Sequence, residues 1–238
     1  MVLSFLETKP FAIIGHRGAA GLAPENTLTA IKKAIEIGVD VVEIDVRMTK
    51  DGEIILLHDE DFSRVAGVKI KPRDYSLREL REKIRIGEDT VASLDDAISL
   101  IDGRVGLFIE IKDVNATNKV VEKVIRENAV EWIAIISFYD EVLEIVKRRA
   151  TRIVTGLIYA KPPGRIFDAK KLGAKIVLPR YSIATKKAND ISHKLGLKVV
   201  AWTINDVITA RRVLENGVDG IASDYPDRMI ALREELKK

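Results

Sequence analysis

Short apolar segments alternate with longer amphipathic segments along the whole chain. This alternation predicts repeated βα units, in which a buried parallel strand is followed by a helix that packs one apolar face against the sheet. The predicted strands are residues 11–15, 40–46, 53–58, 105–112, 132–137, 153–158, 175–178, 198–203 and 219–223. The predicted helices are residues 26–37, 94–101, 116–128, 141–149, 185–195 and 206–216.

The expected helix ends carry local signals. Ser93, Thr185 and Asn205 occupy positions where an N-cap is expected, and Asn26 is assigned the same role before the first helix. Several predicted helices end in a glycine that is followed at once by a new strand. These junctions are residues 37–40, 172–175, 195–198 and 216–219. Because they recur along the chain without a linker between them, residues 1–238 are expected to form a single domain.

The number of predicted strands indicates a closed barrel with one additional strand. A length of 238 residues is close to that of a (β/α)₈ barrel, which has one strand fewer than the segments predicted here. Residues 47–52 are too few for a helical crossover between parallel strands, whereas Asp51 and Gly52 are typical of a hairpin turn. The expected fold is therefore a (β/α)₈ TIM-type barrel with an extra hairpin strand at the C-terminal rim of the barrel.

A two-residue turn at Asp51 and Gly52 also predicts a register for this hairpin. It would set Lys50 opposite Glu53 and Asp45 opposite His58. A long parallel crossover is the alternative, and it would bring the same two side chains to the same rim.

Composition narrows the class of protein. Charged residues make up 32% of the chain and the net charge is +3, with Lys and Arg interspersed among Asp and Glu, which argues against a nucleic-acid partner. Without cysteine there is neither a disulfide framework nor a thiolate metal site. No apolar run reaches the roughly 18 residues of a membrane span. Because residues 1–10 also lack the features of a signal peptide, we expect a cytoplasmic protein without stable membrane insertion.

Acidic side chains interrupt two predicted strands with a period of two. Glu43 and Asp45 share one face of their strand, and Glu110 shares a face with Lys112 on the next barrel strand. The opposite faces are uniformly apolar and are expected to pack against the helices, so the charged faces point into the barrel. Three converging carboxylates repel unless a cation neutralises them, and their oxygen ligands suit Mg²⁺ or Ca²⁺. The alternative is that Lys112 and Arg17 balance most of this charge without a metal.

Two of the three histidines stand at predicted strand ends. His16 follows residues 11–15 directly and His58 closes residues 53–58, whereas His193 lies in a predicted helix and is expected at the surface. Barrel active sites are built at the C-terminal ends of the strands. Because imidazole titrates near neutrality, His16 and His58 could form a general base and general acid pair.

Several motifs occur in an order that is typical of one family. They are His16-Arg17-Gly18, Pro24-Glu25-Asn26-Thr27, Glu43-Ile44-Asp45-Val46, Thr49-Lys50-Asp51-Gly52, Leu57-His58-Asp59, Glu110-Ile111-Lys112, Ser137-Phe138, Ala201-Trp202-Thr203-Ile204-Asn205 and Ser223-Asp224-Tyr225-Pro226-Asp227. In this order and spacing the chain resembles the glycerophosphodiester phosphodiesterase family over nearly its whole length.

The resemblance implies a barrel enzyme that hydrolyses glycerophosphodiesters to glycerol 3-phosphate and an alcohol, with one bound divalent cation, Mg²⁺ or Ca²⁺. By position, His16 and His58 would be the acid/base pair. The resemblance assigns the cation ligands to Glu43, Asp45 and Glu110, phosphate contacts to Arg17 and Lys112, a place near the substrate to Phe138, and the glycerol or leaving-group side to Trp202.

Three other functions stay open at this point. A phospholipase D-like hydrolase of lysophospholipids would use the same groups, a non-catalytic barrel would only bind phosphorylated ligands, and a sugar-phosphate isomerase or aldolase would need a late phosphate loop. The short stretch between His58 and Val105 leaves no room for a large insertion, so the leaving alcohol stays undetermined. The sequence predicts no oligomeric state.

Overall fold

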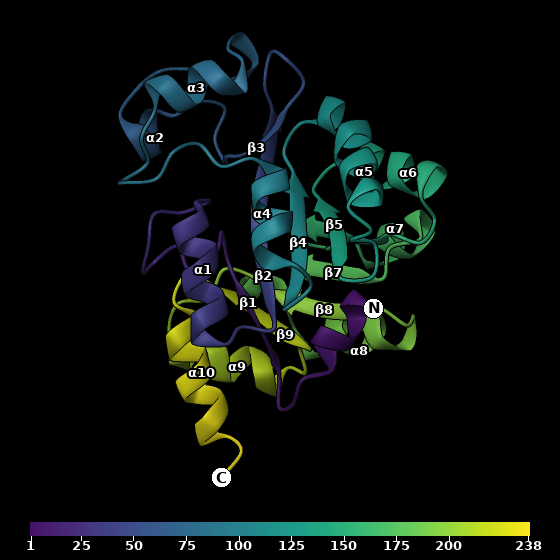
Figure 1. Ribbon diagram of the computed structural model, residues 1–238. Helices are drawn as coiled ribbons and strands as arrows, with labels where there is room; N and C mark the ends of the chain where they lie inside the picture. The colour runs from purple at the N-terminus through teal and green to yellow at the C-terminus, as the bar shows by residue number, and fades with distance from the viewer.

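The computed structural model describes residues 1–238 as a closed barrel of eight parallel strands with helices around it, plus one strand bonded outside the ring (Figure 1). The ring runs β1-β2-β4-β5-β6-β7-β8-β9, and β9 pairs back onto β1. This confirms the predicted TIM-type barrel. The ring strands are β1 (Ala12–Gly15), β2 (Val41–Met48), β4 (Gly106–Ile111), β5 (Ile133–Ser137), β6 (Val154–Tyr159), β7 (Ile176–Pro179), β8 (Lys198–Ala201) and β9 (Gly220–Ser223).

The helices include all those predicted by range and four for which no range was predicted, although the junction at residues 172–175 had marked the end of one of these four, α7 (Ile166–Leu172). The predicted ones are α1 (Leu28–Ile37), α4 (Leu94–Ile101), α5 (Thr117–Arg126), α6 (Asp140–Arg149), α8 (Lys186–Lys194) and α9 (Val207–Glu215). The additional ones are α2 (Ser63–Ala66), α3 (Leu77–Lys83), α7 (Ile166–Leu172) and α10 (Pro226–Glu235). Short 3-10 turns occur at η1 (Val2–Glu7), η2 (Pro72–Asp74), η3 (Val114–Ala116) and η4 (Tyr181–Ile183). None of these helices has the length and apolar character needed to cross a membrane.

The strand outside the ring is β3 (Ile54–Leu56), which pairs antiparallel with β2. This confirms the hairpin and rules out the long parallel crossover. Together with α2 and α3, β3 projects beyond the ring at the top of Figure 1.

The predicted register of this hairpin is wrong by one residue. Arg47 lies opposite Ile55, and the Leu57 amide donates to the carbonyl of Asp45, so Asp45 faces Leu57 rather than His58. The turn contains three residues, because the Thr49 amide donates to the Glu53 carbonyl at 2.9 Å and the Gly52 amide donates to the Thr49 carbonyl at 3.1 Å. Gly52 takes φ +79°, the left-handed conformation that such a turn requires.

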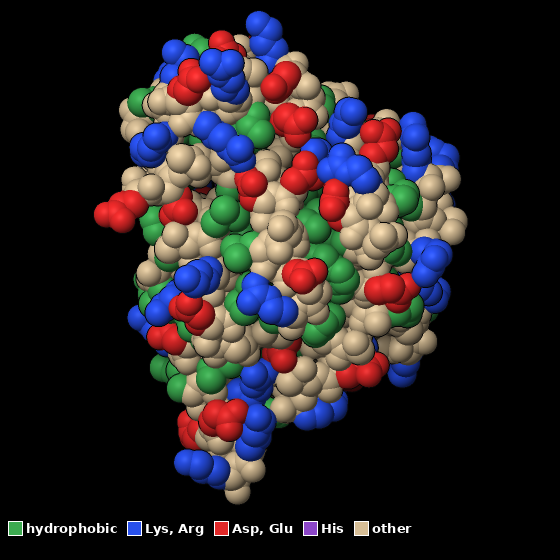
Figure 2. All heavy atoms as spheres, in the orientation of Figure 1, with side chains coloured by type: hydrophobic (Ala, Val, Ile, Leu, Met, Phe, Trp, Pro, Cys, Tyr) green, Lys and Arg blue, Asp and Glu red, His purple; other side chains and the backbone are tan.

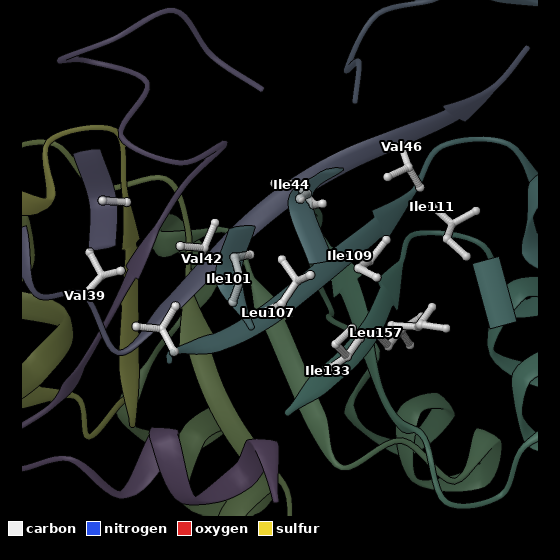
Figure 3. Packing of buried hydrophobic residues seen from close by; sticks show 14 of the residues in the cluster. Val39, Val42, Ile44, Val46, Ile101, Leu107, Ile109, Ile111, Ile133 and Leu157 are labelled. Atoms are coloured by element: carbon white, nitrogen blue, oxygen red, sulfur yellow. The ribbon is translucent and has the colours of Figure 1, made fainter. Parts of the chain in front are cut away.

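Alternate residues of the strands face two different apolar regions. Val42, Ile44 and Val46 of β2, with Leu107, Ile109 and Ile111 of β4, point outward and pack under the helices (Figure 3). The barrel interior holds a second cluster that includes Ile14, Val41, Phe108, Ile136 and Val200. Glu43, Asp45 and Glu110 therefore lie on the inward faces, as the alternation predicted. The outer surface carries interspersed charges of both signs on the face seen in Figure 2.

The segment before β1 closes one end of the barrel. Val2 and Leu6 of η1 belong to the interior cluster and are at most 2% exposed. Thr8 and the β1 amide of Ile13 both donate to Asp40, which Arg233 of α10 also binds. Both ends of the chain are thus fixed to the residue that precedes β2.

Two of the four expected N-caps are confirmed and two are wrong. The side chains of Ser93 and Thr185 cap α4 and α8. Thr27 rather than Asn26 caps α1, and Asp206 rather than Asn205 caps α9, because each of these side chains accepts the amide three residues later.

Leu6→Ala should lower the free energy of unfolding by about 2–4 kcal/mol, because it leaves a cavity in a closed interior cluster. Urea unfolding measures this change. Leu236→Ala, at a position 41% exposed, is the matched control and should stay within about 0.5 kcal/mol of wild type. Equal losses for the two variants would show that η1 does not close the core.

Candidate active site

One pocket at the C-terminal ends of the barrel strands collects almost every residue that the sequence singled out. Its floor is apolar and comes from the interior cluster, including Phe108, Ile136 and Leu178. The polar and aromatic side chains around it are His16, Arg17, Glu43, His58, Glu110, Lys112, Phe138 and Trp202. Asp45 lies beside this wall, fully buried, and pairs with Arg17 and Lys112.

Glu43, Asp45 and Glu110 form a buried acidic cluster in which one oxygen of each lies within 4.8 Å of the others. Burial and the negative charge of Asp45 raise the pKa of Glu43 to about 7 and that of Glu110 to about 8. Burial would also raise the pKa of Asp45, but the charges of Lys112 and Arg17 outweigh it and lower this pKa to about 2. A bound cation would therefore favour the state in which all three are ionised at neutral pH.

The cationic side chains of Lys112 and Arg17 pair with Asp45, whereas neither pairs with Glu43. Lys112 Nζ lies 3.0 Å from Asp45 and also pairs with Glu110, while Arg17 Nε lies 3.2 Å from Asp45. Glu43 accepts one hydrogen bond, from the Arg17 backbone amide at 2.8 Å, and its Oε2 lies 3.9 Å from His16 Nε2; its Oε1, like Asp45 Oδ1, has no hydrogen-bond partner. A buried carboxylate oxygen without a donor costs free energy, and a metal ion would relieve that cost. These carboxylates can therefore accommodate a divalent cation.

Asn26 fixes the orientation of Asp45. Its Nδ2 donates to Asp45 Oδ2 at 2.9 Å, and its Oδ1 accepts the Asp45 amide at 3.0 Å. This explains why Asn26 is not the N-cap of α1: its backbone takes φ +54° and its side chain points to β2.

Each pocket imidazole is held by a carboxylate. His16 Nδ1 lies 2.6 Å from Asp224 Oδ1, and His58 Nδ1 lies 2.6 Å from Asp59 Oδ1. Hydrogen bonds to the histidines help to lower the pKa of both aspartates, so they stay ionised and accept the Nδ1 proton. Nε2 is therefore the nitrogen left for chemistry in each ring.

The two imidazoles have different proton affinities. Burial alone would lower the pKa of His16, but the bond to Asp224 and the charge of Glu43 outweigh it, so the pKa is raised. Burial and the charge of Lys112 lower the pKa of His58, although Asp45 opposes this. Such a separation suits one proton donor and one proton acceptor.

A chain of charged side chains connects the two sides of the pocket. Arg64 of α2 donates to Glu25 through Nη1 at 2.6 Å and Nη2 at 2.7 Å, and its Nε donates to Asp59 at 2.6 Å. Glu25 also accepts from Arg17 Nη1 at 2.9 Å. Arg64 thus links the carboxylate behind His58 to the carboxylate behind Arg17.

The sequence assigned no role in the site to Asp59, Arg64 or Asp224, and it predicted Asn205 only as an N-cap. Asn205 Nδ2 donates to Asp224 at 2.7 Å, which is why it does not cap α9. The available signal was position: Asp59 directly follows a strand-end histidine, and Asp224 directly follows β9. The pairing of Arg64 with Glu25, which are 39 residues apart, had no local signal.

Phe138 and Trp202 form the aromatic side of the pocket. Their rings meet edge to face with centroids 5.6 Å apart, and Trp202 Nε1 donates to the Leu178 carbonyl at 2.7 Å. Lys112 Nζ lies 6.0 Å from the centre of the Phe138 ring. His193 lies outside the pocket on α8, where it pairs with Asp219 at the surface.

The barrel and the polar pocket at its C-terminal rim define a TIM-barrel enzyme. The model of the glycerophosphoryl diester phosphodiesterase family matches residues 16–228, so the chain belongs to that family and is a phosphoric diester hydrolase.

Individual relatives agree with this assignment. A glycerophosphodiester phosphodiesterase from Caldanaerobacter subterraneus subsp. tengcongensis is 30% identical, over 92% of this chain and 96% of the relative. A phosphodiesterase from Oleispira antarctica, solved in complex with the product sn-glycerol-3-phosphate, is 26% identical with a TM-score of 0.84, over 92% of this chain and 95% of the other. A Silicibacter pomeroyi structure with a TM-score of 0.90 is 23% identical over 99% of this chain and 97% of the other, and supports the fold alone.

Arg64→Ala should lower kcat by about tenfold or more while KM changes less, because it frees the carboxylates that orient His58 and Arg17. Steady-state kinetics on a glycerophosphodiester measure both constants. Arg64→Lys should recover part of the loss, since it restores the charge but not the two-pronged bond to Glu25.

Arg152→Ala removes a 79% exposed arginine and is the control, with activity expected near that of wild type. Wild-type kcat in Arg64→Ala would contradict the positioning role. Equal losses of kcat in Arg64→Ala and Arg64→Lys would show that the positive charge at this position does not contribute to the effect.

Proposed function

We propose that this protein hydrolyses glycerophosphodiesters to glycerol 3-phosphate and an alcohol, with His16 and His58 as the acid/base pair. The observation that carries the proposal is two imidazoles, each oriented through Nδ1 by its own carboxylate, lining one pocket with the acidic cluster. The bound product of the Oleispira antarctica relative supports glycerol 3-phosphate as the product here.

Arg17 and Lys112 are proposed to hold the phosphate. Both line the pocket. Ion pairs fix their positions, between Arg17 and Glu25 and between Lys112 and Glu110. A phosphodiester brings one negative charge, and hydrolysis moves further charge onto its oxygens, which fixed cations stabilise. Charge alone would suffice for binding a phosphorylated ligand, whereas paired imidazoles are groups that move protons.

In the proposed reaction, one imidazole accepts a proton from the nucleophile and the other donates a proton to the departing alcohol. One imidazole Nε2 takes the proton of the nucleophile as its oxygen bonds to phosphorus. The bond from phosphorus to the departing alcohol oxygen breaks, and the other imidazole gives that oxygen a proton. The nucleophile is either water or the neighbouring hydroxyl of the substrate's glycerol, in which case water then opens a cyclic phosphate.

Glu43, Asp45 and Glu110 are proposed to hold one Mg²⁺ or Ca²⁺. The donor set is all oxygen, its members are buried, and Glu43 Oε1 lacks any other partner. When bound, such a cation supplies positive charge to the phosphate and its oxygens. The protein contributes the fixed orientation of the ligands, with Asn26 holding Asp45 on two sides.

The aromatic side of the pocket is proposed to hold the glycerol part of the substrate. Phe138 and Trp202 are locked by their mutual contact and by the Leu178 carbonyl, so they offer a rigid wall. The apolar pocket floor excludes water from below, which strengthens the electrostatic contacts of the phosphate.

His16→Ala and His58→Ala should each reduce kcat on glycerophosphocholine by about 10²–10⁴, because each removes a proton-transfer group. His193→Ala is the matched control and should retain activity, because His193 pairs with Asp219 outside the pocket. Turnover within a few-fold of wild type in either pocket variant would overturn the acid/base assignment.

The same assay, repeated with a lysophospholipid, separates the proposed substrate from the phospholipase D-like alternative. The proposal expects the water-soluble diester to have the higher kcat/KM. A clear preference for the lysophospholipid would favour the alternative.

Cation affinity should rise with pH. Glu43 and Glu110, with pKa values of about 7 and 8, are largely protonated at pH 6 and must lose protons to ligate a cation. Isothermal titration calorimetry with Mg²⁺ and with Ca²⁺ should therefore show binding at least about tenfold tighter at pH 8 than at pH 6.

Glu110→Gln should weaken this binding and flatten its pH dependence. Glu127→Gln, which changes an exposed carboxylate far from the pocket, should leave both unchanged. Affinity that is the same at the two pH values, or unaffected by Glu110→Gln, would contradict the assigned ligands.

A further inference from the structure

A second cavity adjoins the active-site pocket at the barrel rim. It lies between the end of β2, the segment that joins β3 to α3, and the loop after β4. Lys112 lines both cavities, so the ammonium proposed to hold the phosphate borders each of them. The two substituents of the phosphorus would then lie in different surroundings.

The walls of the two cavities differ in chemistry. The active-site pocket is closed by Phe138 and Trp202 over an apolar floor. The second cavity is mostly polar, and its charged residues are Arg47, Lys71, Arg73 and Lys112 against Glu60 and Asp113. Cations therefore outnumber carboxylates.

The two carboxylates are already engaged, whereas one cation is free. Asp113 accepts the amide of Asn115 at 3.0 Å and its side-chain nitrogen at 3.1 Å. Glu60 lies 3.5 Å from Lys71. Arg73 makes no ion pair or hydrogen bond with any side chain, so its guanidinium is available to an anion.

Arg47 connects this cavity to the catalytic side. Its Nε and Nη2 donate to the backbone carbonyl of His58 at 3.0 and 2.8 Å. The same guanidinium therefore lines the second cavity and fixes the residue that carries a proposed acid/base imidazole.

We propose that the second cavity is the subsite for the alcohol component opposite the glycerol, and that it selects components carrying an anionic group such as a second phosphate. This proposal rests on the proposed function of the neighbouring pocket. A cationic component such as choline would meet Arg47, Lys71 and Arg73 and only one aromatic ring, that of Tyr139, rather than an aromatic cage.

The test compares three diesters that differ only beyond the phosphorus. They are glycerophosphoglycerol bearing a terminal phosphate, glycerophosphoglycerol and glycerophosphocholine. The expected order of kcat/KM is anionic, then neutral, then cationic, with about tenfold between the first and the last at low ionic strength. Added KCl should reduce this ratio, because Arg73 is exposed and Lys71 is half-buried, so salt screens their charges.

Arg73→Glu should reverse or abolish the preference for the anionic substrate, and Lys71→Ala should reduce it. Arg78→Ala removes an 88% exposed arginine of the following helix, α3, which lies outside the cavity, and should leave the ratio unchanged. A ratio near one in wild type, or a ratio unaffected by Arg73→Glu, would overturn the subsite.

Failure of the subsite is distinguishable from failure of the proposed function. If all three diesters are cleaved with equal efficiency, the enzyme acts on glycerophosphodiesters but the second cavity does not select among them. If none is cleaved in the presence of Mg²⁺ or Ca²⁺, the proposed function itself is wrong.

Discussion

Mutual repulsion among three buried carboxylates is the constraint around which the active-site rim is organised. β2 and β4 are neighbours in the ring, and their register sets Asp45 directly beside Glu110, with Glu43 two residues earlier on the same inward face. Arg17, Lys112 and Asn26 all turn toward Asp45, the one member whose pKa is held low. Glu43 and Glu110 have raised pKa values, which makes the cluster a receptor for positive charge.

The position of β3 follows from the same constraint. A strand inserted between β2 and β4 would separate Asp45 from Glu110, whereas β3 hangs outside the ring and leaves the two strands paired. It nonetheless carries His58 back to the rim. The segment that follows β3 then supplies Arg64, which holds the carboxylates behind both His58 and Arg17. The segment outside the ring, from β3 to α2, thus provides the proposed acid/base residue His58 and the arginine that helps to orient it.

The sequence predicted the barrel and the location of the acidic cluster because both depend on short-range periodicity. Alternation along β2 and β4 determines which side chains point inward, and strand ends determine which reach the rim. The predicted hairpin register is wrong by one residue, because the Asp51-Gly52 pair is typical of a two-residue turn. The actual turn has three residues and is closed by hydrogen bonds between Thr49 and Glu53. Asn26 was misassigned because its side chain is used for tertiary bonding to Asp45 rather than for helix capping.

The supporting layer of the site could not be predicted, since its contacts join distant segments. Asp224 reaches His16 across 208 residues, and Arg64 reaches Glu25 across 39. No periodicity or local motif encodes such pairs. The sequence also did not predict η1. Its two buried apolar residues lie in a short turn without helical or strand periodicity, and they are buried only because they pack into the end of the barrel.

The most direct test of this account is a crystal structure with Mn²⁺ and glycerol 3-phosphate, with anomalous scattering recorded to locate the metal. The account predicts one anomalous peak bounded by oxygens of Glu43, Asp45 and Glu110, and a phosphate that lies between the Nε2 atoms of His16 and His58. A metal bound elsewhere, or a phosphate remote from both imidazoles, would contradict it.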